Sequence, residues 1–167
     1  VTLMLGVALF LNLRAAVIEI GSSEPHTFYE KGAAWLRTHV PPGNIIFNTE
    51  WDDFPRLFYF DSSHYYVSGL DPNYLYDRNP ELSRLYERIT LGQEQNPGPL
   101  IRDRFRSRYV FTDNKHHDFY AAAEESGLFE IVYEDEQCTI FHILDKKPST
   151  EQPQVTPSGP DPMELPG

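Results

Sequence analysis

The chain has 167 residues, a net charge of −11 and a single cysteine. This length suits one domain with a real core, and a single thiol means that the core forms without an internal disulfide. Nucleic acids and anionic lipid surfaces attract basic proteins, so the charge argues against both as partners. Aromatic residues make up 14 % of the chain, which is typical of a packed domain and not of a disordered one.

The N-terminal segment VTLMLGVALFLNL contains no charge before Arg14. A membrane-spanning helix needs roughly 20 apolar residues, and a signal peptide begins with a basic segment that is missing here. We expect residues 1–20 to form the end of a transmembrane helix whose first part is missing. A buried amphipathic helix and a signal sequence without its start are the alternatives. No basic cluster follows, which favours an extracytoplasmic position for the rest of the chain.

The next segments predict helices alternating with strands. Thr27 as a cap, with Glu30 three residues later, predicts the start of a helix, and the Pro-Pro-Gly sequence at 41–43 ends it. Apolar runs predict strands at residues 44–49 and 64–69. The apolar spacing around Phe54 and Leu57 predicts a short helix between these strands. Residues 70–80 are rich in turn-forming residues.

The second half of the chain continues this alternation. Pro80 opens a helix with apolar residues on one side, residues 92–99 form a loop, and a short helix follows at residues 100–105. A third strand is expected at 108–113 and a helix at 115–126. Two segments that alternate with period two then predict a hairpin that turns at Asp135. Residues 145–167 hold six of the 14 prolines and are expected to be a disordered tail.

This order predicts an α/β fold, namely a small three-layer domain over residues 21–144. Its central sheet should be mostly parallel, with a C-terminal antiparallel hairpin, and the end of a transmembrane helix should precede it. Ligands of such sheets bind at the carboxyl ends of parallel strands. The first strand leads into FNTEWDDF and the third into FTDNKHHD, so two polar clusters should meet at one edge.

The candidate substrate-binding residues are Trp51, Asp52, Asp53 and Arg56. An indole can pack on a sugar ring, and carboxylates accept hydrogen bonds from sugar hydroxyls. Clustered carboxylates also suit a divalent metal. Alternatively, Asp52 or Asp53 caps the next helix, or pairs with Arg56. These alternatives stay open, and no catalytic residue, metal site or cofactor is assigned.

Other polar residues have simpler interpretations. Asp113 is expected to cap a helix, with exposed imidazoles at His116 and His117, because adjacent histidines on a helix point in different directions and lack a third ligand. Asp71 is expected to form an Asx turn. His142 should serve packing, and Ser63 lacks the surroundings of a nucleophile elbow.

Three phrases carry a family resemblance: "WL" followed by "PPG", "WDDFPRL" and "GLDPNYLY", together with "RYVFTDN" and the closing hairpin "YEDEQCTIFHI". Over roughly residues 28–144 the chain resembles the C-terminal soluble domain of bacterial multispanning membrane glycosyltransferases of the GT-C type, which include protein mannosyltransferases and aminoarabinose transferases. A looser likeness concerns oligosaccharyltransferases, in which a Trp-Trp-Asp-Tyr-Gly motif after a strand helps to bind the acceptor. Residues 50–54 lie at a similar place, with one Trp, an extra Asp and no Tyr-Gly.

The resemblance implies a domain on the extracytoplasmic side of the cell membrane. Such a domain would cover a membrane active site and help to position the acceptor of a lipid-phosphate-linked sugar. Its partners would be the membrane helices of an N-terminal part, the lipid-linked sugar and the acceptor. The family's catalytic acid lies in an earlier loop, so this piece should not turn over substrate by itself. The alternative is a membrane-anchored, non-enzymatic module for ligand binding or interaction.

Overall fold

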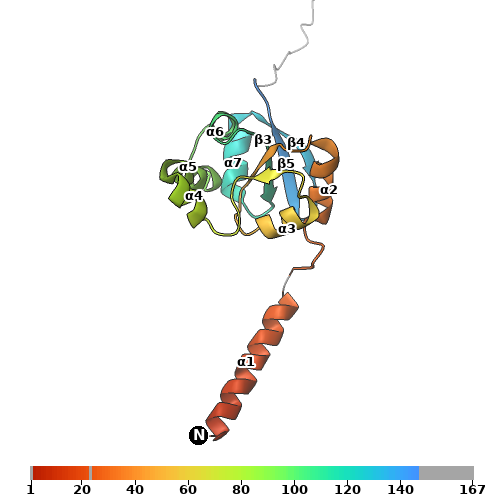
Figure 1. Ribbon diagram of the computed structural model, residues 1–167, viewed down its shortest axis with the longest axis vertical. Coiled ribbons are helices and arrows are strands. Elements are labelled where there is room, and N and C mark those ends of the chain that lie inside the picture. Colours follow the sequence, from red (N-terminus) through yellow and green to blue (C-terminus); the bar gives the residue numbers. More distant parts are fainter. Residues whose placement is uncertain (1, 23, 147–167) are drawn as a thin grey trace, which may run out of the picture.

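The computed structural model describes residues 2–22 and 24–146 and shows an α/β domain preceded by a separate helix (Figure 1). The helices are α1 (Thr2–Ser22), α2 (Glu30–His39), α3 (Phe54–Phe60), α4 (Asn73–Arg78), α5 (Pro80–Thr90), α6 (Pro97–Arg104) and α7 (His117–Ser126). The strands are β1 (Ile45–Asn48), β2 (Tyr65–Tyr66), β3 (Ser107–Asp113), β4 (Phe129–Glu134) and β5 (Cys138–Ile143). The α/β class predicted from the sequence is confirmed.

The five strands form one sheet in the order β2-β1-β3-β5-β4. β1 pairs in parallel with β2 and with β3, whereas β5 pairs antiparallel with β3 and with β4. The expectation of a mostly parallel sheet therefore holds only for the half around β1. The predicted hairpin is present, but its second strand inserts between β3 and β4. Because consecutive strands joined by a tight turn run in opposite directions, the sheet is mixed.

Helices cover both faces of this sheet, as the expected three layers require. On one face, α2 and α3 pack through Leu36 and Leu57 on Ile46 and Phe111. On the other face, α5, α6 and α7 pack on the sheet through a second set of buried side chains: Phe47, Leu85, Ile89, Ile101, Val110, Phe119 and Phe141. Neighbouring strand residues such as Ile46 and Phe47 enter different clusters because side chains alternate across a strand.

Several boundaries differ from the sequence prediction. α2 begins at Glu30, not at Thr27, and follows Tyr29, whose φ of 71° closes a turn instead of a Thr cap. Tyr29 is buried, and its backbone N–H donates to Oε1 of Gln137 over 2.8 Å, so a tertiary contact moves the helix start. β2 is only two residues long. The turn-rich stretch contains α4, next to the expected Asx turn, in which Asn73 N–H donates to Asp71 Oδ1.

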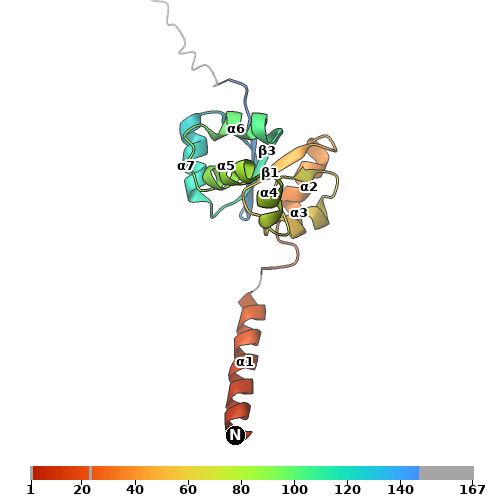
Figure 2. The same cartoon turned by 60° about the vertical axis from the view of Figure 1, so that its left-hand side comes forward.

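The N-terminal segment is helical, and its apolar side chains are exposed. Met4, Leu5, Leu9, Phe10 and Leu11 are each more than half exposed, and α1 stands apart from the domain in two views (Figures 1 and 2). Within residues 2–22 and 24–146, no helix combines the length and apolarity needed to cross a membrane. The expected disordered tail lies, from residue 147 onward, outside the described residues.

Candidate functional site

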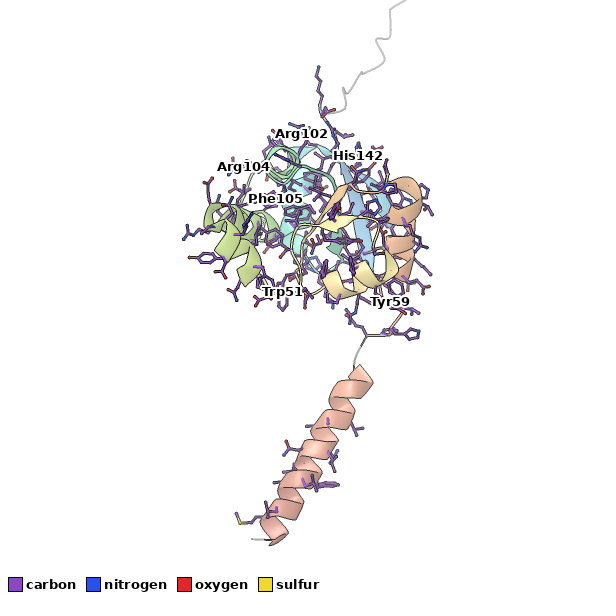
Figure 3. The ribbon with its side chains drawn as sticks, viewed as in Figure 1. Trp51, Tyr59, Arg102, Arg104, Phe105 and His142 are labelled. Carbon is purple, nitrogen blue, oxygen red and sulfur yellow. The ribbon has the colours of Figure 1, made fainter. Side chains whose placement is uncertain are left out.

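The ends of β1 and β3 meet at one edge of the sheet, as the sequence predicted. The backbone N–H of Thr49 donates to the carbonyl of Phe111 over 3.1 Å, and the Thr49 hydroxyl donates to that of Thr112 over 2.9 Å. Both threonines are buried. The polar clusters that follow these strands are therefore fixed beside each other, and Trp51, which belongs to the first cluster, lies at the lower edge of the domain in Figure 3.

His116 joins the two clusters. Its Nε2 lies 2.9 Å from Oε1 of Glu50, and its Nδ1 bonds to Oδ1 of Asp113. Burial alone would lower the pKa of His116, but the bond to Asp113 and the charges of Asp113 and Glu50 outweigh it, so the pKa is raised above 6.5. With a carboxylate at each nitrogen, the surroundings favour the imidazolium form of the ring. The expectation that this imidazole is exposed is wrong, because its side chain is only 15 % exposed.

Asp113 does not cap α7. Its Oδ1 accepts the backbone N–H of Lys115 over 3.1 Å, which closes a turn, and the position before the helix belongs to His116. Burial tends to raise the pKa of Asp113, but His116 and Lys115 lower it on balance. The carboxylate therefore binds the imidazolium instead of the helix end that the sequence suggested.

Asn48 shapes the loop that carries the candidate residues. Its fully buried amide donates to the carbonyls of Glu50 and Ser68 over 2.6 Å each, and its Oδ1 accepts the Ser68 N–H. Tyr86 on α5 donates its hydroxyl to the Asn48 carbonyl over 2.8 Å. This bonding replaces further β2 ladder pairing, which explains why β2 is short. Sequence reasoning did not select Asn48 or Tyr86; the only available signal was an Asn at the end of an apolar run.

Trp51 and Asp52 project from the same loop. Trp51 is 39 % exposed and Asp52 is exposed as well, and Trp51 lies at the lower edge of the domain in Figure 3, between α3 and α4. An aromatic face beside a carboxylate offers apolar contact and hydrogen-bond acceptance together. Of the four candidate residues, these two are exposed, whereas Arg56 is half-buried and Asp53 is buried.

Asp53 occupies the position before α3 but does not cap that helix. Its side chain makes no capping bond, the residue is 6 % exposed, and Oδ2 is buried without a hydrogen-bond partner. Burial raises the pKa of Asp53 to about 7; Tyr29 counteracts part of this effect, and Asp113, Asp52 and Glu50 add to it. The cap interpretation is therefore wrong for Asp53, whose carboxyl group lies inside an acidic cluster.

Arg56 pairs with neither Asp52 nor Asp53. Its guanidinium bonds to Glu24 over 2.6 Å and lies over the ring of Phe28 at 5.3 Å. Glu24 also lies 3.3 Å from the ammonium of Lys115. Arg56 therefore holds the segment that enters the domain, and this entry point adjoins the edge that carries Trp51.

A hollow of about 340 Å³ opens beside the candidate residues, at the end of β2. Phe54, Leu70, Tyr74 and Leu75 form its apolar wall, and Arg78 lies at its border. Gly69 is required under this wall, because a Cβ there would lie 2.2 Å from Cγ of Phe54. Residues 70–80, which supply Leu70, Tyr74, Leu75 and Arg78 to this hollow, were interpreted from the sequence only as rich in turn-forming residues.

The other polar residues that the sequence drew attention to have structural surroundings. Nδ1 of His64 lies 2.5 Å from Oδ2 of Asp61, and Nε2 faces the carbonyls of Val40 and Pro41. The Ser63 hydroxyl donates to Asp61 over 2.6 Å, and it lies 3.3 Å from Nδ1 of His64, a nitrogen that already bonds to Asp61. His142 packs against the ring of Tyr109 at 5.1 Å. Within the part of the chain that the structure describes, no three His, Cys, Asp or Glu side chains are arranged to hold a metal ion.

Comparisons of the chain with models of known protein families, with curated proteins and with solved structures return no match.

Proposed function

We propose that this chain is the extracytoplasmic α/β domain of a membrane glycosyltransferase that uses a lipid-phosphate-linked sugar. In this proposal, Trp51 and Asp52 contact the acceptor. The observation that carries the proposal is the pairing of an exposed indole and an exposed carboxylate on one loop at the carboxyl edge of the sheet. Carbohydrates present apolar ring faces together with hydroxyl donors, and this pair of side chains complements both.

The loop is supported in a way that suits recognition. Asn48 fixes it to β2, and the Glu50–His116 pair fixes it to the end of β3. Because rigid support lowers the entropy cost of binding, the exposed side chains can act as a prepared surface. The entry segment held by Glu24 adjoins the same edge, which supports a position of this surface on the membrane side of the proposed transferase.

The test uses full-length transferase with Trp51→Ala and Asp52→Asn. Each variant should lower the transfer rate while its melting temperature stays close to that of the parent, because both side chains are exposed. Leu91→Ala and Glu124→Gln, at two exposed positions elsewhere in the domain, serve as controls and should keep the parent rate. Variants of Trp51 and Asp52 that melt normally and transfer at the parent rate would remove the acceptor role.

A second experiment tests whether this chain catalyses sugar transfer by itself. The present chain, incubated with a lipid-phosphate sugar and an acceptor, should give no product above background, because the resemblance assigns the catalytic acid to another part of the protein. Turnover by this chain alone would contradict its role as an accessory domain. Binding of a small ligand that does not depend on transfer would favour the alternative, a membrane-anchored binding module built around the hollow beside Tyr74.

A further inference from the structure

The exposed apolar side chains of the domain are concentrated in one region. Among its described residues, nine large apolar side chains are exposed. Seven of them come from α3, β2, α4 and the adjoining loops: Trp51, Phe58, Tyr59, Tyr65, Leu70, Tyr74 and Tyr76. The other two, Leu91 and Ile131, lie elsewhere in the chain. Single exposed apolar residues are ordinary, whereas a cluster marks an interaction surface.

Four of these residues, Phe58, Tyr59, Leu70 and Tyr74, define what is called here the α3–α4 surface. Phe54 connects its parts, because it stacks on Phe58 with ring centroids 5.4 Å apart and lines the same hollow as Leu70 and Tyr74. The surface is strongly exposed, from 49 % at Phe58 to 80 % at Tyr59. Figure 3 places Tyr59 and Trp51 at the end of the domain nearer to α1.

The chain itself keeps this surface close to the end of α1. The helix ends at Ser22, and Glu24 is bound to Arg56 on α3 and to Lys115. Two residue steps span at most about 7 Å. The end of α1 therefore stays beside α3, whatever direction the helix takes, and whatever surrounds α1 also lies near the α3–α4 surface.

The side chains of α1 indicate what surrounds it. Leu9, Phe10 and Leu11 are consecutive and 58–62 % exposed. Successive residues of a helix point about 100° apart, so the apolar surface continues around the helix instead of forming one stripe. Along this turn α1 is apolar on all sides, although Asn12 and Arg14 follow it, and lipid hydrocarbon supplies an apolar environment for such a turn.

We propose that the α3–α4 surface docks into the headgroup layer of the membrane that holds α1. This inference rests on the proposed function of a domain at a membrane, and on α1 lying in that membrane without crossing it by itself. Tyr and Trp favour the membrane–water interface because they combine an apolar ring with a polar group. The hollow within the surface is bordered by both Asp71 and Arg78, and the whole chain carries −11. Such a surface suits zwitterionic headgroups, whereas an anionic membrane would repel the domain.

The test reads the depth of Trp51 in liposomes of zwitterionic phosphatidylcholine. The full chain carries Trp35→Phe, so that Trp51 is the remaining indole, and some lipids carry bromine on their acyl chains as a quencher. We expect bromine to quench Trp51 emission. Replacing Phe58, Tyr59, Leu70 and Tyr74 together by Ser should remove most of this quenching. Leu91→Ser with Ile131→Ser, a matched loss of exposed apolar groups, should leave it unchanged.

Co-flotation of the chain with the liposomes separates the possible failures. A chain that does not float contradicts membrane insertion and, with it, the proposed function. If the chain floats but Trp51 is not quenched, or if the four-residue variant is quenched like the parent, the docking surface is wrong while the proposed function stands. Protection of residues 70–76 from hydrogen exchange that persists in detergent would assign the surface to a second protein chain instead, and would overturn lipid docking.

Discussion

Nε2 of His116 lies 2.9 Å from Oε1 of Glu50, although 65 intervening residues separate the two in the chain. Glu50 follows β1 and His116 follows β3, and these strands are parallel neighbours. The contact therefore results from topology: parallel strands bring their carboxyl ends to one edge. It also explains why the loop with Trp51 and Asp52 is fixed on both sides.

The first prediction concerns this contact. His116→Gln should destabilise the full chain at pH 6 by about 1 kcal/mol, since it removes a charged donor shared by two carboxylates. The pKa of His116 is raised in the folded chain, so its stabilisation is complete below pH 6.5 and is lost as the pH rises through the raised pKa. The difference between parent and variant should therefore shrink toward pH 9.

Chemical unfolding in mild detergent at pH 6 and pH 9 measures this difference. The exposed neighbour His117 supplies the control, because His117→Gln should be nearly neutral at both values. A His116→Gln effect that grows toward pH 9 would contradict the ion pair.

The second prediction concerns the buried carboxyl group of Asp53. Its pKa is raised from 3.8 to about 7, so the folded chain holds this proton more tightly than the unfolded chain does. The contribution of Asp53 to stability therefore falls as the pH rises from about 4 to about 7. Asp53→Asn keeps the shape and removes the titration, so it should stabilise the chain at pH 8 relative to the parent by on the order of 1 kcal/mol or more.

Melting curves from pH 5 to pH 8 test this expectation, and Glu124→Gln, which changes an exposed carboxylate on α7, should leave the pH profile unchanged. A loss of stability in Asp53→Asn at pH 8 would show that the ionised carboxylate stabilises the folded chain, which contradicts a raised pKa of Asp53.

The sequence predicted the edge of the sheet better than it predicted the bonding at that edge. Apolar periodicity and strand order locate residues 48–53 and 113–116 together, because these features are local and follow general rules of topology. The partner of each side chain depends on contacts between distant segments. Arg56 binds Glu24 from the entry segment, and Asn48 binds Ser68 of the next strand. Asp53 is buried beside Tyr29, and this burial leaves it without the capping bond that its position suggests.

The third prediction concerns the buried pair of Asp61 and His64, whose side chains are both 0 % exposed. The imidazole bonds to the carboxylate and also to the carbonyls of Val40 and Pro41, so it ties the start of β2 to the segment before β1. His64→Ala leaves a buried carboxylate without its partner, and we expect a loss of roughly 3 kcal/mol of stability.

Ser63→Ala removes one hydrogen bond to the same carboxylate and should cost only about 1 kcal/mol. Ser62→Ala, at an exposed position, is the neutral control. Denaturant midpoints of the three variants test this order. Equal midpoints for His64→Ala and Ser62→Ala would show that the pair does not stabilise the fold.

The last prediction concerns the close approach of α2 to the sheet. Gly32 faces β5, and a Cβ at this position would lie 2.5 Å from Sγ of Cys138 and 3.2 Å from the ring of Phe111. Both neighbours are fully buried, so they have little room to move. Gly32→Ala should therefore destabilise the domain by about 1–3 kcal/mol through overpacking, although alanine favours a helix. Gly6→Ala in α1, where nothing lies within 4 Å of the added Cβ, is the contrasting control.

Removing the obstructing sulfur should relieve the strain, so Gly32→Ala with Cys138→Ala should be more stable than the sum of the two single changes implies. Free energies of unfolding for the parent, both single variants and the double variant test this coupling, and strict additivity would show that Gly32 and Cys138 do not limit the packing of α2.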